Sequence, residues 1–179
     1  MVTFSKATPY LFYQTAHHAP FVSHGEGIYI YDQDGNRYID GCSGAMICNI
    51  GHGDKRVIEA MQHQAEFISY TYRTQFENEP AHLLATRLVE NSAPHLNRVF
   101  YVSGGSEAVE SCLKLARQYF YVQGEGRNIF ISRRPSYHGA TMGALSVTSY
   151  APLKNPYLPM LRPQPKIPAP YCYRCYYGL

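Results

Sequence analysis

The sequence predicts an α/β fold, in which helices flank a parallel-type sheet and a small β-hairpin element lies near the N-terminus. Three observations support the parallel sheet. Residues 98–102 (RVFYV) are typical of a short buried strand, residues 109–120 repeat apolar side chains at helical spacing, and residues 128–131 (NIFI) are typical of a second buried strand. A strand, a helix and a strand joined by short links form a βαβ unit, whose two strands run parallel.

The composition indicates a globular protein, because 45% of the residues are hydrophobic and 16% are charged. No apolar run approaches the ~20 residues that a membrane-spanning helix needs. The formal charge of +3 comes without a basic block, which argues against a nucleic-acid surface. The first twenty residues lack the pattern of a secretory signal, and five cysteines suit a reducing compartment. We therefore expect a cytoplasmic protein that binds neither membranes nor nucleic acid.

The N-terminal part begins with the hairpin. Residues 27–31 (GIYIY) lead into Asp34-Gly35, a pair that tolerates the positive φ of a tight turn, and residues 36–40 (NRYID) return. From Asp54 the apolar spacing becomes helical, and Asp54 is placed to cap the first turn. A further helix is predicted to start near Pro80, since proline is tolerated in a first turn.

The composition changes after Tyr150, where seven of the chain's twelve prolines fall between Pro152 and Pro170. We expect an extended loop there without regular helix or sheet. The predicted organisation is an N-terminal segment with the hairpin (1–50), the first half of an α/β domain (51–150) and a proline-rich loop (151–179).

Small residues fill the link between the first predicted strand of the βαβ unit and its helix, in the stretch VSGGSEAVE (102–110). Such a link lies at the carboxyl edge of the sheet, where ligands bind. The helix N-terminus offers unpaired N–H groups, Gly104 and Gly105 let an anion approach the backbone, and Ser103 or Ser106 can donate a hydroxyl. The stretch therefore predicts a phosphate site. An ordinary helix N-cap, where Ser and Gly are also favoured, is the alternative interpretation.

A second stretch, SYHGATMGALSVT (136–148), follows the second predicted strand, so its loop is expected at the same sheet edge. The ring of Tyr137, freed by Gly139 nearby, is placed to lie against a planar ligand held by its phosphate. A planar ring with a phosphate indicates pyridoxal phosphate or a nucleotide. Alternatively, Tyr137 and His138 are ordinary loop residues.

Together, SGGSEAVESCLKLARQY and SYHGATMGALSVT, with GNRYIDGCSGAM and NIGHG upstream, closely resemble the class III pyridoxal-phosphate-dependent aminotransferases of fold type I. The resemblance runs from about Gly27 to the end and implies part of that family's large cofactor domain. It implies that Gly105 and Ser106 bind the phosphate of pyridoxal 5′-phosphate, and that Tyr137 stacks on the pyridine ring. The implied cofactor-binding residues are Gly104, Gly105, Ser106, Tyr137, His138 and Gly139, and the implied substrate-pocket residues are Ala45 and Met46.

The resemblance also implies a homodimer that transfers an amino group from an amino donor to an oxo acid or aldehyde. In this family a lysine forms the Schiff base with the cofactor. None of the lysines stands in a matching context, so no catalytic residue is predicted in this chain: Lys6, Lys55, Lys114, Lys154 and Lys166. We therefore expect the N-terminal portion of a longer enzyme, inactive by itself.

Two alternatives to transamination remain open at this point. The first is other pyridoxal-phosphate chemistry on the same scaffold, as in an aminomutase, decarboxylase or lyase. The second is a non-catalytic domain that binds phosphates or nucleotides. Cys172 and Cys175 form a C-x-x-C pair, but a structural zinc site would need two further ligands, so no metal site is predicted.

Overall fold

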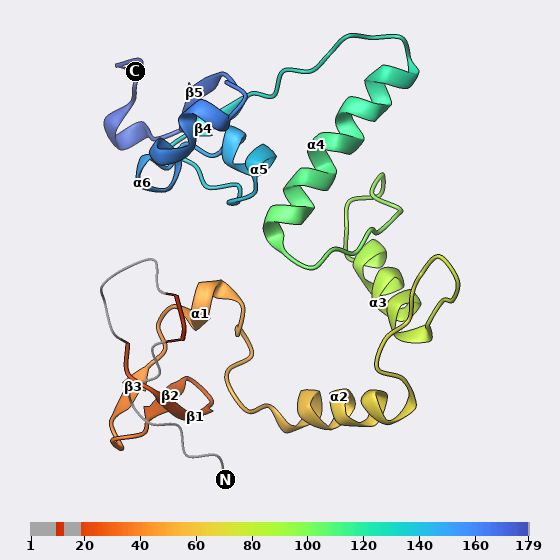
Figure 1. The fold of residues 1–179 in the computed structure, drawn as a ribbon, viewed down its shortest axis with the longest axis vertical. Coiled ribbons are helices and arrows are strands. Elements are labelled where there is room, and N and C mark those ends of the chain that lie inside the picture. The colour runs from red at the N-terminus through yellow and green to blue at the C-terminus, as the bar shows by residue number, and fades with distance from the viewer. Residues whose placement is uncertain (1–9, 13–18, 179) are drawn as a thin grey trace. The chain divides into compact units, whose positions relative to one another are not determined.

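The computed structural model describes residues 10–12 and 19–178, which divide into two compact units, one before residue 80 and one from Pro80 onward (Figure 1). Both units contain helices, and each contains one sheet, so the predicted α/β class is confirmed. Within the described residues, no helix combines the length and the apolar character needed to cross a membrane. The N-terminal unit consists of β1 (Val22–Glu26), β2 (Tyr29–Asp32), β3 (Arg37–Ile39), α1 (Ser43–Met46) and α2 (Lys55–Phe67).

The sheet of the N-terminal unit is antiparallel, in the order β1-β2-β3. Asp32 fixes the turn between β2 and β3. Its carboxylate accepts hydrogen bonds from the backbone N–H groups of Asp34 and Asn36 (2.9 and 2.8 Å), the Asn36 side chain (2.9 Å) and the Tyr38 hydroxyl (2.8 Å). The Asn36 side chain in particular lowers the pKa of Asp32. The predicted hairpin is confirmed, and β1 extends it to three strands.

The two helices predicted from apolar spacing are present. The side chain of Asp54 accepts the backbone N–H of Arg56 (3.0 Å) and so caps α2, as expected. Helix α3 (Glu79–Glu90) begins next to Pro80, which therefore lies in the first turn, where its missing N–H leaves no intrahelical bond unmade.

The C-terminal unit holds one long helix and several short elements after α3. They are α4 (Gly105–Val122), β4 (Ser132–Arg134), α5 (Met142–Val147), α6 (Ala151–Lys154), the 3₁₀ helix η1 (Asn155–Met160), β5 (Lys166–Pro168) and the 3₁₀ helix η2 (Cys172–Arg174). Strands β4 and β5 pair in parallel, with Ser132 opposite Lys166. The parallel-type sheet is thus present, as a two-stranded pair.

The two strands predicted at residues 98–102 and 128–131 are wrong as strand assignments. A strand is defined by hydrogen bonds to a neighbour, and within the described residues no segment pairs with residues 98–102. The side chain of Gln164, instead of a neighbouring strand, accepts the backbone N–H of Phe130 (2.8 Å). In the C-terminal unit, regular strand pairing begins only at β4, directly after the second predicted strand.

The expectation that residues 151–179 contain no regular element is also wrong. Pro152 stands in the first turn of α6 and Pro156 in the first turn of η1, where proline is tolerated. Strand β5 places Pro168 at its last position, and the pairing continues past it because the backbone N–H of Ala169 donates to Arg134 O (3.0 Å). Prolines in the first turn of a helix or at the last position of a strand are therefore compatible with short regular elements here.

The core of the C-terminal unit is centred on α5, in which residues 144–147 are buried. Two lysines close its carboxyl end. Lys166 Nζ donates to Ser146 O (3.1 Å) and Val147 O (2.7 Å), and Lys154 Nζ donates to Ser146 O (2.9 Å) and Thr148 O (2.8 Å). The last carbonyls of a helix carry partial negative charge, so these ammonium groups suit that end.

The pKa of Lys166 is expected to lie well below the ordinary lysine value. Burial lowers its pKa to about 8, and the positive charges of Lys154 and Arg134 add to this effect. A side-chain NMR titration should show a midpoint for Lys166 near that value, and Lys154→Met should raise it, whereas Lys55→Met should not. A midpoint for Lys166 at the ordinary lysine value of 10.5 would contradict this prediction.

The same pKa shift fixes the sign of a pH effect on stability. The pKa of Lys166 rises from about 8 in the folded protein to 10.5 in the unfolded chain, so unfolding takes up a proton between these pH values. The contribution of Lys166 to the free energy of unfolding therefore rises with pH across that range.

Candidate functional site

The N-terminus of α4 is open. Gly104 is its N-cap residue, with the extended backbone (φ −163°, ψ 170°) usual for that position, and it has no side chain with which to cap the helix. A Cβ placed on Gly104 or Gly105 would meet no other atom within 4 Å. There is thus free space beside the backbone of Gly104 and Gly105, at the helix end where unpaired N–H groups lie.

Ser106 connects this helix end to the second predicted stretch. Its Oγ accepts the backbone N–H of Ala140 at 3.0 Å, across 34 residues of sequence. A hydroxyl that accepts one hydrogen bond still has its own proton to donate. The structure thus brings VSGGSEAVE and SYHGATM into direct contact, and it leaves the Ser106 proton available to a ligand at the helix end.

Gly139 makes this contact possible. Its φ of +128° lies in a region that side chains rarely adopt, and a Cβ there would lie 2.7 Å from Ser106 Oγ and 2.9 Å from both Ser106 Cα and Ala144 Cβ. Only glycine therefore fits between the first turn of α4 and the start of α5.

Thr148 holds the segment that carries Tyr137. Fully buried, it accepts the backbone N–H of His138 (3.0 Å) through Oγ1 and lies 3.0 Å from both Gly139 O and Ala144 O. Tyr137 is 62% exposed, which leaves its side chain accessible to a ligand. Nε2 of His138 is buried and has no hydrogen-bond partner among the described residues.

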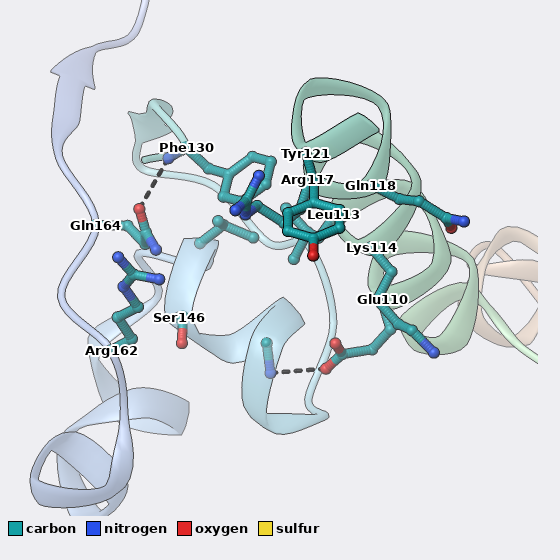
Figure 2. Close-up of a pocket in the computed structure, with 12 residues that line it drawn as sticks. Glu110, Leu113, Lys114, Arg117, Gln118, Tyr121, Phe130, Ser146, Arg162 and Gln164 are labelled. Carbon is teal, nitrogen blue, oxygen red and sulfur yellow. Dashed lines mark hydrogen bonds between the residues drawn. The ribbon is translucent and has the colours of Figure 1, made fainter. Parts of the chain in front are cut away.

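Glu110 forms a second link between α4 and α5, one turn beyond Ser106. Its Oε1 accepts the backbone N–H groups of Gly143 (2.6 Å) and Ala144 (3.1 Å), and Figure 2 shows the carboxylate turned toward α5. Glu110 was not among the predicted site residues. Its position four residues after Ser106 places it on the same helix face, but this spacing alone does not show that it contacts α5.

The pKa of Glu110 is lowered despite its partial burial. Burial acts to raise the pKa, but the polar groups of residues 141–144 and the positive charge of Lys114 outweigh it. Glu110 is therefore a carboxylate at neutral pH, and its bonds to α5 are charge-assisted.

A cavity of about 510 Å³ lies beside this link, between α4, α5 and residues 162–164 (Figure 2). Its walls are mainly apolar, with Leu113, Phe130 and Val147 among them, and Lys114, Arg117 and Arg162 add positive charge. None of the predicted cofactor-binding residues lines it. The cavity is therefore not the predicted phosphate site.

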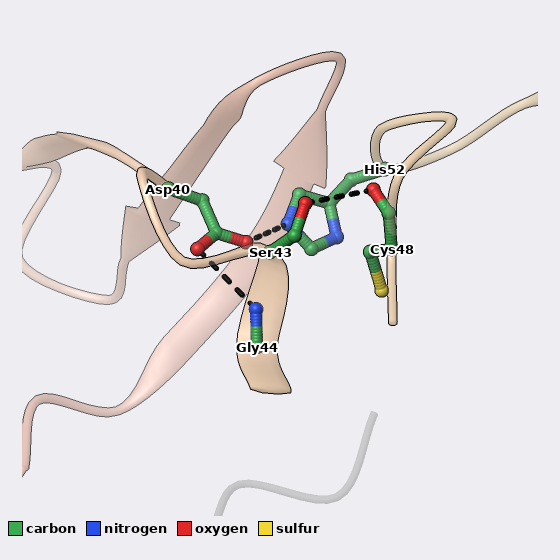
Figure 3. A network of polar contacts seen from close by, with 5 residues as sticks. All are labelled: Asp40, Ser43, Gly44, Cys48 and His52. Carbon is green, nitrogen blue, oxygen red and sulfur yellow. Dashed lines mark hydrogen bonds and ion pairs between the residues drawn. The ribbon is translucent and has the colours of Figure 1, made fainter. Parts of the chain in front are cut away.

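The predicted substrate-pocket residues, Ala45 and Met46, belong to the N-terminal unit, in the irregular turn α1. Met46 and Ser43 have positive φ (63° and 51°), which is unusual for residues other than glycine. The Ser43 hydroxyl donates to Cys48 O (3.0 Å), which closes the turn on itself (Figure 3).

Asp40 and His52 hold the two ends of the same loop. His52 Nε2 lies 2.8 Å from Asp40 Oδ2, and Gly44 N donates to Asp40 Oδ1 at 3.4 Å (Figure 3). The bond with His52 is the main reason that the pKa of Asp40 is lowered. The loop that carries Ala45 and Met46 is thus fastened by a polar pair that sequence reasoning did not identify.

Cys172 is exposed at the start of η2, and Cys175 is half-buried just after it. Among residues 10–12 and 19–178, no three His, Cys, Asp or Glu side chains come together in a way that could hold a metal ion.

Comparison with known proteins identifies a family. The family model described as "Aminotransferase class-III" matches residues 12–177. The uncharacterised aminotransferase YodT of Bacillus subtilis is 42% identical over 156 residues, which are 87% of this chain and 35% of YodT. The adenosylmethionine-8-amino-7-oxononanoate aminotransferase of Methanocaldococcus jannaschii is 41% identical over 158 residues, covering 87% of this chain and 34% of that enzyme. The chain spans about a third of the length of these relatives.

Solved structures give the same result. The crystal structure of the M. jannaschii enzyme superposes with a TM-score of 0.84 at 36% identity, over 90% of this chain and 39% of that one. An amine transaminase from an uncultivated Pseudomonas species, in its PLP-bound form, superposes with a TM-score of 0.82 at 32% identity, over 98% of this chain and 41% of that one.

Proposed function

Because this chain belongs to the class III aminotransferases, we propose that the N-terminus of α4 and residues 137–139 bind pyridoxal 5′-phosphate. In the full-length protein this cofactor would serve the transfer of an amino group from an amino donor to an oxo acid or aldehyde. The observation that carries the proposal is the bond between Ser106 Oγ and Ala140 N, because it joins an open helix end to the segment of the Tyr137 ring.

Each residue has a defined part in binding. The backbone N–H groups of Gly105 and Ser106 and the Ser106 hydroxyl donate to the phosphate, and Gly104 leaves room for it. Tyr137 stacks on the pyridine ring, with His138 and Gly139 fixing its backbone. The buried Nε2 of His138, which has no partner among the described residues, is consistent with a polar group nearby in the loaded protein. When bound, the cofactor supplies an electron sink for the substrate's Cα.

The nucleophilic lysine is proposed to lie outside this sequence. Lys154 and Lys166 donate to the carbonyl groups at the end of α5, so their ammonium groups are engaged in hydrogen bonds that stabilise the fold. Since the chain spans about a third of its relatives' length, the full-length protein has room for a lysine elsewhere. This chain's own residues would bind and orient the cofactor and would not react with it.

The turn that carries Ala45 and Met46 is proposed to line the substrate pocket. The positive φ angles of Ser43 and Met46 support this, because an unfavourable backbone conformation of this kind clusters at functional sites and persists only where surrounding contacts enforce it. Here Asp40 accepts the N–H of Gly44 and is itself bound to His52. The family membership also supports a cytoplasmic homodimer as the assembled form.

The test is a titration of the full-length protein with pyridoxal 5′-phosphate, followed by the absorbance of the bound cofactor. Tyr137→Ala should weaken binding about tenfold, because the stacking contact is lost, whereas Tyr137→Phe keeps the ring and should bind nearly as well. Thermal stability of the cofactor-free protein should not change in either variant, since Tyr137 is 62% exposed.

Absence of saturable binding by the unaltered protein would refute the proposed function. Equal affinity of Tyr137→Ala and the unaltered protein would refute the role of the ring only.

A further inference from the structure

Glu110 caps α5 from a different helix. The first turn of α5 has two backbone N–H groups, those of Gly143 and Ala144, that both donate to Glu110 Oε1. Thr141, the N-cap residue of α5, makes no capping hydrogen bond through its side chain. The carboxylate of Glu110 therefore replaces the local cap that α5 lacks, and its negative charge suits the positive end of that helix.

The contact in its present geometry needs a residue without a side chain at position 143, because a side chain there would push the Glu110 carboxylate aside. A Cβ built on Gly143 would overlap both carboxylate oxygens of Glu110. Helices α4 and α5 can thus approach until the carboxylate touches the α5 backbone. Because the pKa of Glu110 is lowered, the carboxylate is charged at neutral pH and these hydrogen bonds are charge-assisted.

Ser106 and Glu110 act on the same segment from one face of α4, because they are four residues apart. Ser106 accepts the N–H of Ala140, and Glu110 accepts those of Gly143 and Ala144. Residues 140–144 are therefore tied to α4 at two points. The first point belongs to the proposed phosphate site, and the second lies one turn away from it.

We propose that Glu110 is a positioning residue, which sets the distance between the phosphate-binding end of α4 and the ring of Tyr137. The inference rests on the proposed function, since the distance matters only to a ligand that carries a phosphate and a ring. Ala144, whose N–H donates to Glu110, has its carbonyl oxygen 3.0 Å from Thr148 Oγ1. Thr148 Oγ1 in turn accepts the backbone N–H of His138, the residue after Tyr137. The position of Tyr137 is thus coupled to Glu110 through Ala144, Thr148 and His138.

This role predicts different effects on two ligands. Inorganic phosphate uses only the helix end, so its affinity does not depend on where Tyr137 lies. Pyridoxal 5′-phosphate needs both contacts at once, and its affinity falls when the segment shifts. A change that merely damages the fold would weaken both ligands.

The experiment compares Glu110→Leu with Glu110→Gln in the full-length protein. Glu110→Leu removes both charge-assisted hydrogen bonds and should raise the dissociation constant of pyridoxal 5′-phosphate about tenfold or more. The inhibition constant of inorganic phosphate, measured by competition with the cofactor, should stay within about twofold, an effect of under about 0.4 kcal/mol. Glu110→Gln keeps an oxygen that can accept both N–H groups and should restore most of the cofactor affinity.

Glu90→Leu, the same change at the exposed end of α3, is the matched control and should leave both constants unchanged. Unaltered cofactor affinity in Glu110→Leu would overturn the proposal, and so would a parallel loss of phosphate and cofactor affinity. Failure of the unaltered protein to bind the cofactor would instead overturn the proposed function.

Discussion

Gly104→Asp is expected to abolish cofactor binding while making the protein slightly more stable. Aspartate is a favoured N-cap residue, and the backbone of Gly104 already has the extended conformation that an N-cap needs. Its carboxylate would accept the N–H groups of the first turn of α4, adding about 0.5 kcal/mol to the free energy of unfolding. The same carboxylate would occupy the donors that the phosphate needs and repel its charge. Affinity for pyridoxal 5′-phosphate should fall at least about a hundredfold.

Two measurements check this prediction, a cofactor titration and a thermal or urea unfolding curve of the apoprotein. Gly126→Asp is the control, because Gly126 is an exposed loop residue of the same unit with open space around it. If the helix end is only an ordinary cap, Gly104→Asp will gain stability and still bind the cofactor. That result would contradict the phosphate site.

Gly139→Val is expected to destabilise the C-terminal unit strongly. The side chain would have to adopt a φ of +128° and would overlap Ser106 and Ala144. Backbone strain and overpacking together should cost about 4 kcal/mol. Because Gly139 lies between the first turn of α4 and the start of α5, the substitution should also separate these two helices and abolish cofactor binding.

Urea unfolding of the full-length protein measures this loss, with Gly126→Val as the control, since a valine there meets no atom within 4 Å of its Cβ. A Gly139→Val protein as stable as the control would show that the close approach of Gly139 to Ser106 does not exist in solution.

The parts of the fold that local sequence determines were predictable. The turn between β2 and β3, the Asp54 cap of α2 and the apolar repeat of α4 each depend on residues within a few positions of one another. Their hydrogen bonds form within the element or with the next one, so the pattern alone predicts them. The contact between residues 102–110 and 136–148 was also predicted, but from parallel strands at residues 98–102 and 128–131 that the structure does not contain.

The rest depends on distant partners. Residues 98–102 have the composition of a buried strand, but pairing requires a neighbour that no local pattern supplies. Glu110 was not predicted as a site residue for a related reason. Thr141 stands where a local cap for α5 is expected, and nothing in the sequence says that Glu110, 33 residues earlier, provides the bond to Gly143 instead. Lys154 and Lys166 likewise gain their partners only in the folded unit.

The most direct test of the central claim is a crystal structure of the full-length protein with pyridoxal 5′-phosphate bound. We expect the phosphate at the N-terminus of α4, within hydrogen-bond distance (about 2.7–3.2 Å) of the Gly105 and Ser106 N–H groups. We also expect the pyridine ring to lie against Tyr137. A phosphate bound elsewhere, with the end of α4 exposed to solvent, would contradict the claim.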